Sequence, residues 1–184
     1  MNRRFIVFDV ETPNARNNRI SSIGIATAEG GRIVDTFTSL VNPETHFDRF
    51  NVILTGITPE MVRSAPNFAE LWRTIGPMME SGILIAHNAP FDMRVLADCI
   101  DRYEIDFPRY VTYGCTVRMG RQAYPDMVNH KLDTMCGELD IPLDHHKADS
   151  DCLACARLLL NYMERGLDIN RFLRTYDMWN KKTV

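Results

Sequence analysis

The 184-residue sequence has no long hydrophobic run. Its longest apolar stretches, at residues 5–10 and 82–86, are far shorter than the roughly 20 residues that span a bilayer. The chain also opens without the basic and then apolar segment of a secretory leader. We therefore expect no membrane association and a cytoplasmic location.

The sequence lacks a disulfide framework and a large excess of charge of one sign. Five cysteines at irregular spacings do not resemble a disulfide framework, so we expect reduced thiols. The 21 Lys and Arg nearly balance the 24 Asp and Glu, which gives a net charge of −3. The whole protein thus exerts no general pull on nucleic acid, although a metal-loaded acidic site would reverse the charge that a substrate meets locally.

Linkers rich in Pro, Gly or Ser are absent, and so are internal repeats. The composition, 45% hydrophobic and 24% charged, is typical of a soluble globular protein. A chain of this length buries roughly 70% of the surface that its unfolded form exposes, so it folds without disulfide or metal. We expect one domain over residues 1–184.

Local patterns predict an α/β fold. Residues 4–10, 20–28 and 32–41 are rich in β-branched and aromatic residues, as strands are, and helix-capping signals stand at Thr58 and Asn67. Three strands followed by alternating helices and strands indicate a mixed sheet flanked by helices. The later strands are expected at 82–86 and 110–115, and the later helices at 90–103, 115–123, 131–139, 147–165 and 168–177.

Four carboxylates stand at positions that ought to be apolar. In the first strand, alternation puts Asp9 and Glu11 on an otherwise apolar face. Two of the predicted helices carry an apolar stripe of residues three and four apart, and each stripe begins with an acid, Asp92 or Asp151. All four acids are therefore expected to point inward.

Inward-pointing acids need partners, because an isolated ionised carboxylate costs several kcal/mol or more to remove from water. An arginine or a helix N-terminus could satisfy any one of them, but hardly all four. Two divalent cations would balance four negative charges, and hard oxygen ligands suit Mg²⁺ or Mn²⁺. Carboxylates two residues apart on a strand can bracket two ions about 3.5–4 Å apart, an arrangement suited to phosphoryl transfer.

Two histidines, His145 and His146, precede the helix that carries Asp151. A loop histidine at the mouth of a metal site can take a proton from a bound water near neutral pH. An ordinary exposed loop histidine is the alternative, and the short distance in sequence to Asp151 favours the functional interpretation.

Three motifs resemble one family in order and spacing, over residues 4–160. The first, Phe8-Asp9-Val10-Glu11-Thr12, is similar to the Asp-x-Glu-Thr of the DEDDh 3′–5′ exonucleases, the DnaQ-like family that includes the epsilon subunit of bacterial DNA polymerase III. The second, His87-Asn88-Ala89-Pro90-Phe91-Asp92, resembles the family's His-Asn-x-x-Phe-Asp. The third, His146-Lys147-Ala148-Asp149-Ser150-Asp151, matches His-x-Ala-x-x-Asp and leaves His145 out of register.

The resemblance implies an RNase H-like fold with a central five-stranded mixed sheet flanked by helices. It also implies that Asp9, Glu11, Asp92 and Asp151 hold two divalent ions, Mg²⁺ or Mn²⁺, and that His146 is the general base. The expected reaction releases nucleoside 5′-monophosphates from the 3′ ends of single-stranded DNA. RNA is the alternative substrate, since the 2′-hydroxyl is discriminated by local contacts. A non-catalytic nucleic-acid-binding module is a further alternative, which the complete set of acids and histidine disfavours.

Four more residues are candidate substrate contacts. Thr12 is expected at the 3′-terminal nucleotide, and Lys147, beside His146, at a phosphate. Asn88 is expected to shape the turn of the second motif, and Phe91 to lie in the core or else in the base pocket. Pro13 departs from the family pattern and lacks a backbone donor. We expect no long tail for docking onto a polymerase, and the resemblance leaves a polymerase partner and a homodimer open.

Overall fold

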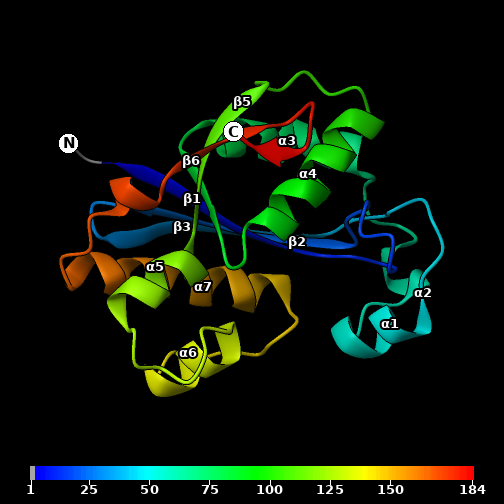
Figure 1. Ribbon diagram of the computed structural model, residues 1–184. Helices are drawn as coiled ribbons and strands as arrows, with labels where there is room; N and C mark the ends of the chain where they lie inside the picture. Colours follow the sequence, from blue (N-terminus) through cyan, green and yellow to red (C-terminus); the bar gives the residue numbers. More distant parts are fainter. Residues whose placement is uncertain (1–2) are drawn as a thin grey trace.

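The computed structural model describes residues 3–184 as a sheet with helices on both faces (Figure 1). The expected mixed α/β fold is confirmed, but the sheet has seven strands instead of five, in the order β3-β2-β1-β4-β5-β6-β7. The strands are β1 (Arg4–Glu11), β2 (Ser22–Glu29), β3 (Arg32–Leu40), β4 (Ile83–Ala86), β5 (Tyr110–Cys115), β6 (Arg174–Asp177) and β7 (Lys182–Thr183). The helices are α1 (Arg49–Thr55), α2 (Pro59–Val62), α3 (Phe68–Glu80), α4 (Pro90–Arg102), α5 (Thr116–Ala123), α6 (Leu132–Glu138), α7 (Ala148–Glu164) and the 3₁₀ helix η1 (Ile169–Phe172).

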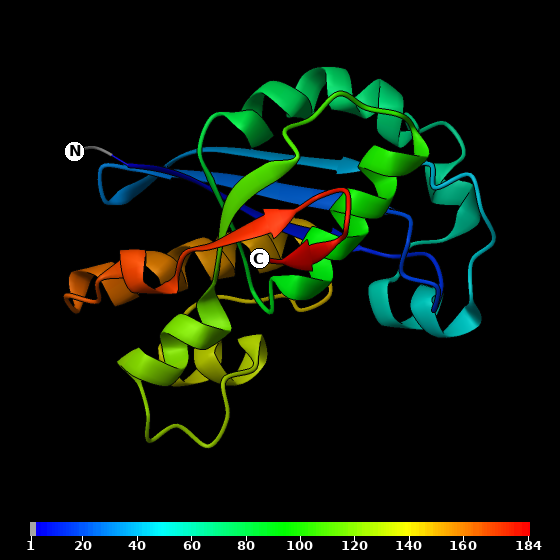
Figure 2. The same ribbon diagram turned by 45° about the horizontal axis from the view of Figure 1, so that its top comes forward.

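The two additional strands lie at the C-terminal end, where the predicted helix over 168–177 is wrong. The structure has η1 there, followed by β6, which pairs antiparallel with β5 (red beside green in Figure 2). Apolar residues at Ile169, Phe172 and Tyr176 imitate a helical spacing. The open edge of β5 offers ladder hydrogen bonds that outweigh this weak local preference.

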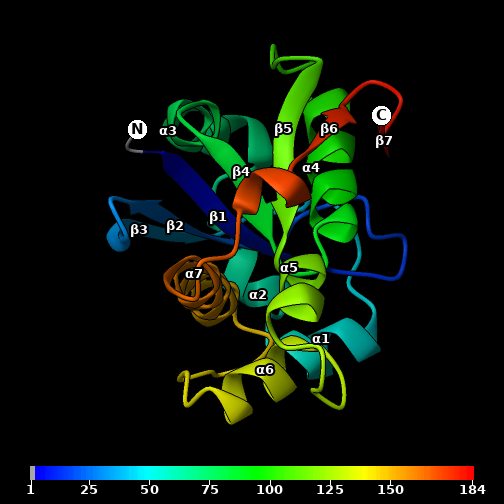
Figure 3. The same cartoon turned by 60° about the vertical axis from the view of Figure 1, so that its left-hand side comes forward.

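β1 lies in the middle of the sheet and separates two cores. It pairs antiparallel with β2 and parallel with β4. Its alternate residues Ile6 and Phe8 belong to the core under α3 and α4, whereas Phe5 and Val7 belong to the core under α5, α6 and α7. Figures 1 and 3 show these two groups of helices on opposite faces of the sheet. The predicted alternation of β1 is confirmed.

α7 packs unusually close to β2, because Gly24 has no side chain. A Cβ atom at Gly24 would lie 2.0 Å from the carbonyl oxygen of Ala148, the first residue of α7. Gly24 is also the partner of Asp9 in the β1–β2 ladder. This close approach places the first turn of α7, with Asp151, beside Asp9.

The five cysteines are all buried, and they are free, which agrees with the expected reduced thiols. Among residues 3–184, no helix is both long and apolar enough to cross a membrane.

Candidate active site

The carboxylates meet at the carboxyl end of β1. Asp9 and Glu11 end this strand, and the first turn of α7 brings Asp151 to them. One oxygen from each of these three residues lies within 4.8 Å of the other two. β2 and β3 extend the sheet on one side of β1, whereas β4 and the later strands extend it on the other side. The order in which strands are added to the sheet therefore changes direction at β1. Crevices at such a point are where open α/β sheets bind ligands.

Asp92 reaches the same place from the other face of the sheet. It lies in the first turn of α4 and is 2% exposed. Its Oδ1 accepts a hydrogen bond of 3.3 Å from the backbone N–H of Val10, the residue between Asp9 and Glu11. Asp92 stands beside the group of three oxygens without belonging to it. The structure therefore brings all four predicted acids to one end of β1.

No Lys or Arg forms an ion pair with these acids in the described part of the chain. Burial and then repulsion from the other carboxylates raise the pKa of Asp9 well above its ordinary value, and burial is also the main cause that raises the pKa of Asp92. Burial raises the pKa of Glu11 to about 7 and that of Asp151 to about 6. The fold thus holds four acidic groups together without an ion pair to Lys or Arg among the described residues.

This donor set fits divalent cations. Oδ1 of Asp151 is buried and has no hydrogen-bond partner among residues 3–184. An acceptor left open in this way, beside the oxygens of Asp9 and Glu11, is what a metal ion would satisfy. Carboxylate oxygens are hard ligands, which favours Mg²⁺ or Mn²⁺ over zinc or copper.

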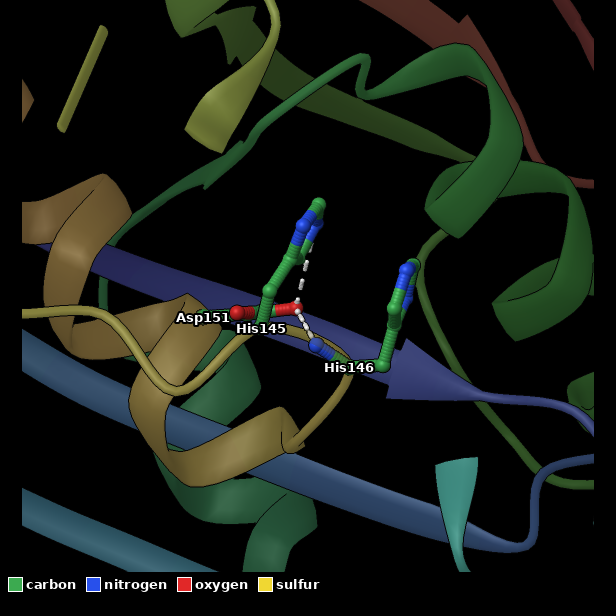
Figure 4. Close-up of side chains that lie close together, drawn as sticks. All are labelled: His145, His146 and Asp151. Carbon is green, nitrogen blue, oxygen red and sulfur yellow. Dashed lines mark hydrogen bonds and ion pairs between the residues drawn. The ribbon is translucent and has the colours of Figure 1, made fainter. Parts of the chain in front are cut away.

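Both histidines of the loop before α7 stand at Asp151. The backbone N–H of His146 donates to Oδ2 of Asp151 at 3.0 Å, and Nε2 of His145 lies 3.9 Å from the same oxygen (Figure 4). His146 has a φ of 67°, in the left-handed region, and the two imidazole rings stack with centroids 4.0 Å apart. Burial lowers the pKa of His146, which favours the neutral ring that a general base requires. His145, out of register in the motif, is thus a neighbour in space.

A cleft of about 720 Å³ opens over the acids, and three of the four predicted substrate contacts line it: Thr12, Asn88 and Phe91. Phe91 is 38% exposed and lines the cleft, so its predicted place in the core is wrong, while a contact with a base stays a prediction. Asn88 has a φ of 59°, which agrees with a turn-shaping role. Lys147 does not line the cleft and pairs with Asp144, so a phosphate contact from it stays a prediction.

The segment that follows β1 is tied to α1, a helix that the sequence analysis does not predict. Nδ2 of Asn51 donates to the backbone oxygen of Thr12 at 2.9 Å, and Oγ1 of Thr12 donates to Asn17 at 2.9 Å. The backbone oxygen of Pro13 accepts from Asp48, just before α1, at 2.9 Å. The Pro13 departure from the family pattern therefore lies in a segment held by α1.

The sequence does not predict α1, because the helix signals in this segment are weak. It has seven residues and no side-chain cap, and its apolar residues Phe50 and Ile53 face solvent at 69% and 71% exposure. The one available signal of a functional residue in α1 is Asn51, a polar residue inside an apolar run. Asn51 is buried in the structure.

His87 of the second motif also lines the cleft. Its Nδ1 lies 2.9 Å from Oγ1 of Thr116, whereas its buried Nε2 has no hydrogen-bond partner among the described residues. Burial lowers the pKa of His87 to about 4, so this ring is neutral at physiological pH.

The sequence of residues 6–159 matches the exonuclease family. This match agrees with the geometry of the site. The chain belongs to the DnaQ-like family of DEDDh 3′–5′ exonucleases. A DNA polymerase III of PolC type from Oceanobacillus iheyensis is 37% identical over 164 residues, which make up 88% of this chain and 11% of that protein. The chain thus spans about a tenth of the length of this curated relative.

Solved structures share the fold of this exonuclease family member. Exonuclease X in complex with 5′ overhanging duplex DNA has a TM-score of 0.73 and 24% identity, over 92% of this chain and 96% of that chain. The nuclease domain of 3′hExo, a DEDDh family member bound to rAMP, has a TM-score of 0.73 and 19% identity, over 91% of this chain and 94% of that chain.

Proposed function

We propose that residues 1–184 form one exonuclease domain that removes nucleotides from the 3′ ends of single-stranded DNA and releases nucleoside 5′-monophosphates. The observation that carries this proposal is the group of Asp9, Glu11 and Asp151 oxygens within 4.8 Å of one another, with no Lys or Arg partner among residues 3–184. DNA is favoured because the Oceanobacillus relative is a DNA polymerase, although this chain corresponds to only 11% of it.

In this proposal the three grouped acids and Asp92 together hold two divalent ions, Mg²⁺ or Mn²⁺. When bound, such ions lower the pKa of a water molecule and stabilise charge on the leaving 3′ oxygen. The imidazole of His146 accepts the proton of the attacking water. Asp151 orients His146 by accepting its backbone N–H. Thr12, held by Asn51, contacts the 3′-terminal nucleotide.

Time-resolved degradation of 5′-labelled single-stranded DNA tests the proposal, with Mg²⁺, with Mn²⁺ and with EDTA. We expect a ladder that shortens from the 3′ end and requires the metal. Shortening from the 5′ end, or equal rates in EDTA, would contradict the mechanism. Tight binding without cleavage under every condition would favour the non-catalytic binding module.

An exoribonuclease activity is the second candidate. It is favoured by the likeness to the 3′hExo nuclease domain, which was solved with the ribonucleotide rAMP. A parallel assay on RNA of the same sequence decides between the two, because the faster polymer identifies the preferred sugar.

A polymerase partner or, as the alternative, a homodimer completes the proposal, together with a cytoplasmic location. The polymerase partner is suggested by the PolC-type relative, and the reducing compartment by five free cysteines. Light scattering on the purified chain, alone and mixed with a candidate polymerase, distinguishes the monomer, the homodimer and the complex by mass.

A further inference from the structure

The two walls of the cleft differ in chemistry. α1 supplies one wall with Phe50 and Leu54, which are both exposed. α5 and the loop before α6 supply the other wall with Arg121 and Lys131. Figure 2 shows α1 (cyan) and α5 with α6 (yellow-green) apart, on opposite sides of the end of β1. Exposed apolar side chains therefore line the cleft on the α1 side, and two cations line it on the side of α5 and α6.

Arg121 and Lys131 are the two Lys or Arg side chains that line the cleft. Within residues 3–184, neither charged head group forms an ion pair, whereas Lys147 pairs with Asp144 and Lys181 pairs with Asp98. Two exposed cations beside a cluster of carboxylates thus keep their charge free for an anionic ligand.

The cationic wall is held by local contacts. Nε2 of His130 lies 2.9 Å from the backbone oxygen of Tyr124, and Asn129 Oδ1 accepts the backbone N–H of Lys131 at 2.9 Å. α5 packs directly on α7, because a Cβ atom at Gly120 would lie 2.8 Å from the hydroxyl of Tyr162. The backbone that presents the two cations is therefore well positioned before any ligand binds.

We propose that Arg121 and Lys131 bind the phosphodiester groups on the 5′ side of the scissile bond, while the bases of the same strand lie against Phe50 and Leu54. A single strand carries its negative charge along one edge and apolar base faces along the other, which matches the two walls. Only unpaired bases can reach Phe50. The inference rests on the proposed exonuclease function, and it names a single strand of two or more nucleotides as the ligand.

Two substrates separate this inference from the proposed function. The p-nitrophenyl ester of thymidine 5′-monophosphate has no upstream phosphate, whereas an oligo(dT) strand has many. We expect the ratio of kcat/KM for oligo(dT) to that for the ester to fall roughly tenfold in the Arg121→Ala, Lys131→Ala double variant. The slope of log kcat/KM against log salt concentration is negative, and its magnitude should decrease by about 0.7 for each cation removed.

Arg157→Ala is the matched control, because Arg157 is exposed on α7 and does not line the cleft. It is expected to keep the wild-type ratio and slope. Wild-type ratio and slope in the double variant would overturn the inference, while hydrolysis of the ester would still support the proposed function. Should the wild type hydrolyse neither substrate, fluorescence anisotropy with labelled oligo(dT) and Ca²⁺ still tests the inference, since equal Kd values for the wild type and the double variant would overturn it.

The apolar wall has its own test. Phe50→Ala is expected to weaken binding of oligo(dT) by roughly three- to tenfold, because a base loses its aromatic contact. A strand of the same length with abasic sites should bind the wild type and Phe50→Ala equally, while the double variant still binds it more weakly than the wild type. An equal loss on both strands in Phe50→Ala would overturn the placement of the bases.

Discussion

Buried acids at opposite ends of the sheet have opposite surroundings, and their pKa values shift in opposite directions. Asp177 ends β6, where it pairs with Tyr110 at the start of β5, so it lies at the far end of the sheet from the cleft. It is 3% exposed and accepts hydrogen bonds from Arg109 at 3.0 Å and from the side chain of Asn180 at 2.8 Å. The Arg109 contact holds the pKa of Asp177 well below its ordinary value.

The acids around β1 have the reverse surroundings. Glu11 and Asp151 are equally well buried, yet neither has a Lys or Arg partner in the described chain, and their pKa values rise to about 7 and about 6. Asp177 is satisfied within the fold, whereas the acids around β1 remain available to a ligand that the fold itself does not supply. Groups with such shifted pKa values in a cleft are candidates for function.

The largest effect is expected when an acid of the β1 group is replaced by its amide. Asp151→Asn should lower the rate of 3′-end cleavage by roughly three orders of magnitude, because a proposed metal ligand is lost. The same change should raise the free energy of unfolding at pH 7 by about 1–3 kcal/mol without metal, since a buried like charge is removed. Cleavage assays and urea unfolding check the two effects.

The matched change at the other end is Asp177→Asn. It should lower Tm by about 2–4 °C through loss of the Arg109 ion pair, and leave the specific activity of the folded protein at the wild-type level. Full turnover in Asp151→Asn would refute the proposed metal site, and a gain of Tm in Asp177→Asn would end the distinction between the two kinds of acid.

His146→Ala should lower kcat by about 10²–10⁴-fold, because the proposed general base is lost while the carboxylates remain. The increase of Tm on addition of Mn²⁺ should persist, which separates a loss of proton transfer from a loss of metal binding. An unchanged kcat would assign the proton transfer elsewhere. His145→Ala in parallel shows whether the neighbouring ring can act in its place.

Gly24→Ala tests whether the close approach of α7 assembles the cluster. The added methyl group would lie 2.0 Å from the Ala148 carbonyl oxygen, so we expect a loss of about 3 kcal/mol in unfolding free energy. Cleavage should fall as well, because Asp151 moves away from Asp9. Gly137→Ala is the control, since a Cβ atom at Gly137 meets nothing within 4 Å. Wild-type activity in Gly24→Ala would show that the acids tolerate a wider separation.

The smallest expected effect is on the pH dependence of unfolding free energy, which should differ in sign between the two kinds of acid. The folded pKa values of Glu11 and Asp151, about 7 and about 6, lie above their ordinary values of 4.5 and 3.8. The folded state thus binds more protons than the unfolded state between about pH 4 and pH 7, so these groups lower stability as pH rises through that range.

For Asp177 the sign is reversed, because a depressed pKa contributes stability that is lost on acidification below its ordinary value of 3.8. In EDTA, unfolding free energy measured with urea should fall by about 1–2 kcal/mol from pH 6 to pH 7. Mg²⁺ should reduce this fall, because a bound cation stabilises the ionised acids. A rise of stability from pH 6 to pH 7 in EDTA would contradict the raised pKa values.

Much of the site could be predicted from the sequence, because the four acids are placed by periodicity. Alternation along one strand fixes the shared face of Asp9 and Glu11, and the first position of an apolar helical stripe fixes Asp92 and Asp151. These are local relations, which neighbours in the chain determine. The mixed α/β fold and the family membership follow from the same order of elements and motifs.

The tertiary structure alone decided which residues surround the acids. Lys147 adjoins His146 in the sequence, yet the lysine that lines the cleft is Lys131, because the α5–α6 loop folds over the end of β1. Residues 174–177 form a strand only because the edge of β5 is open to pair with them. Local sequence sets periodicity and turns, whereas the partner of an edge strand or the wall of a cleft depends on segments distant in the chain, whose contacts exist only in the folded protein.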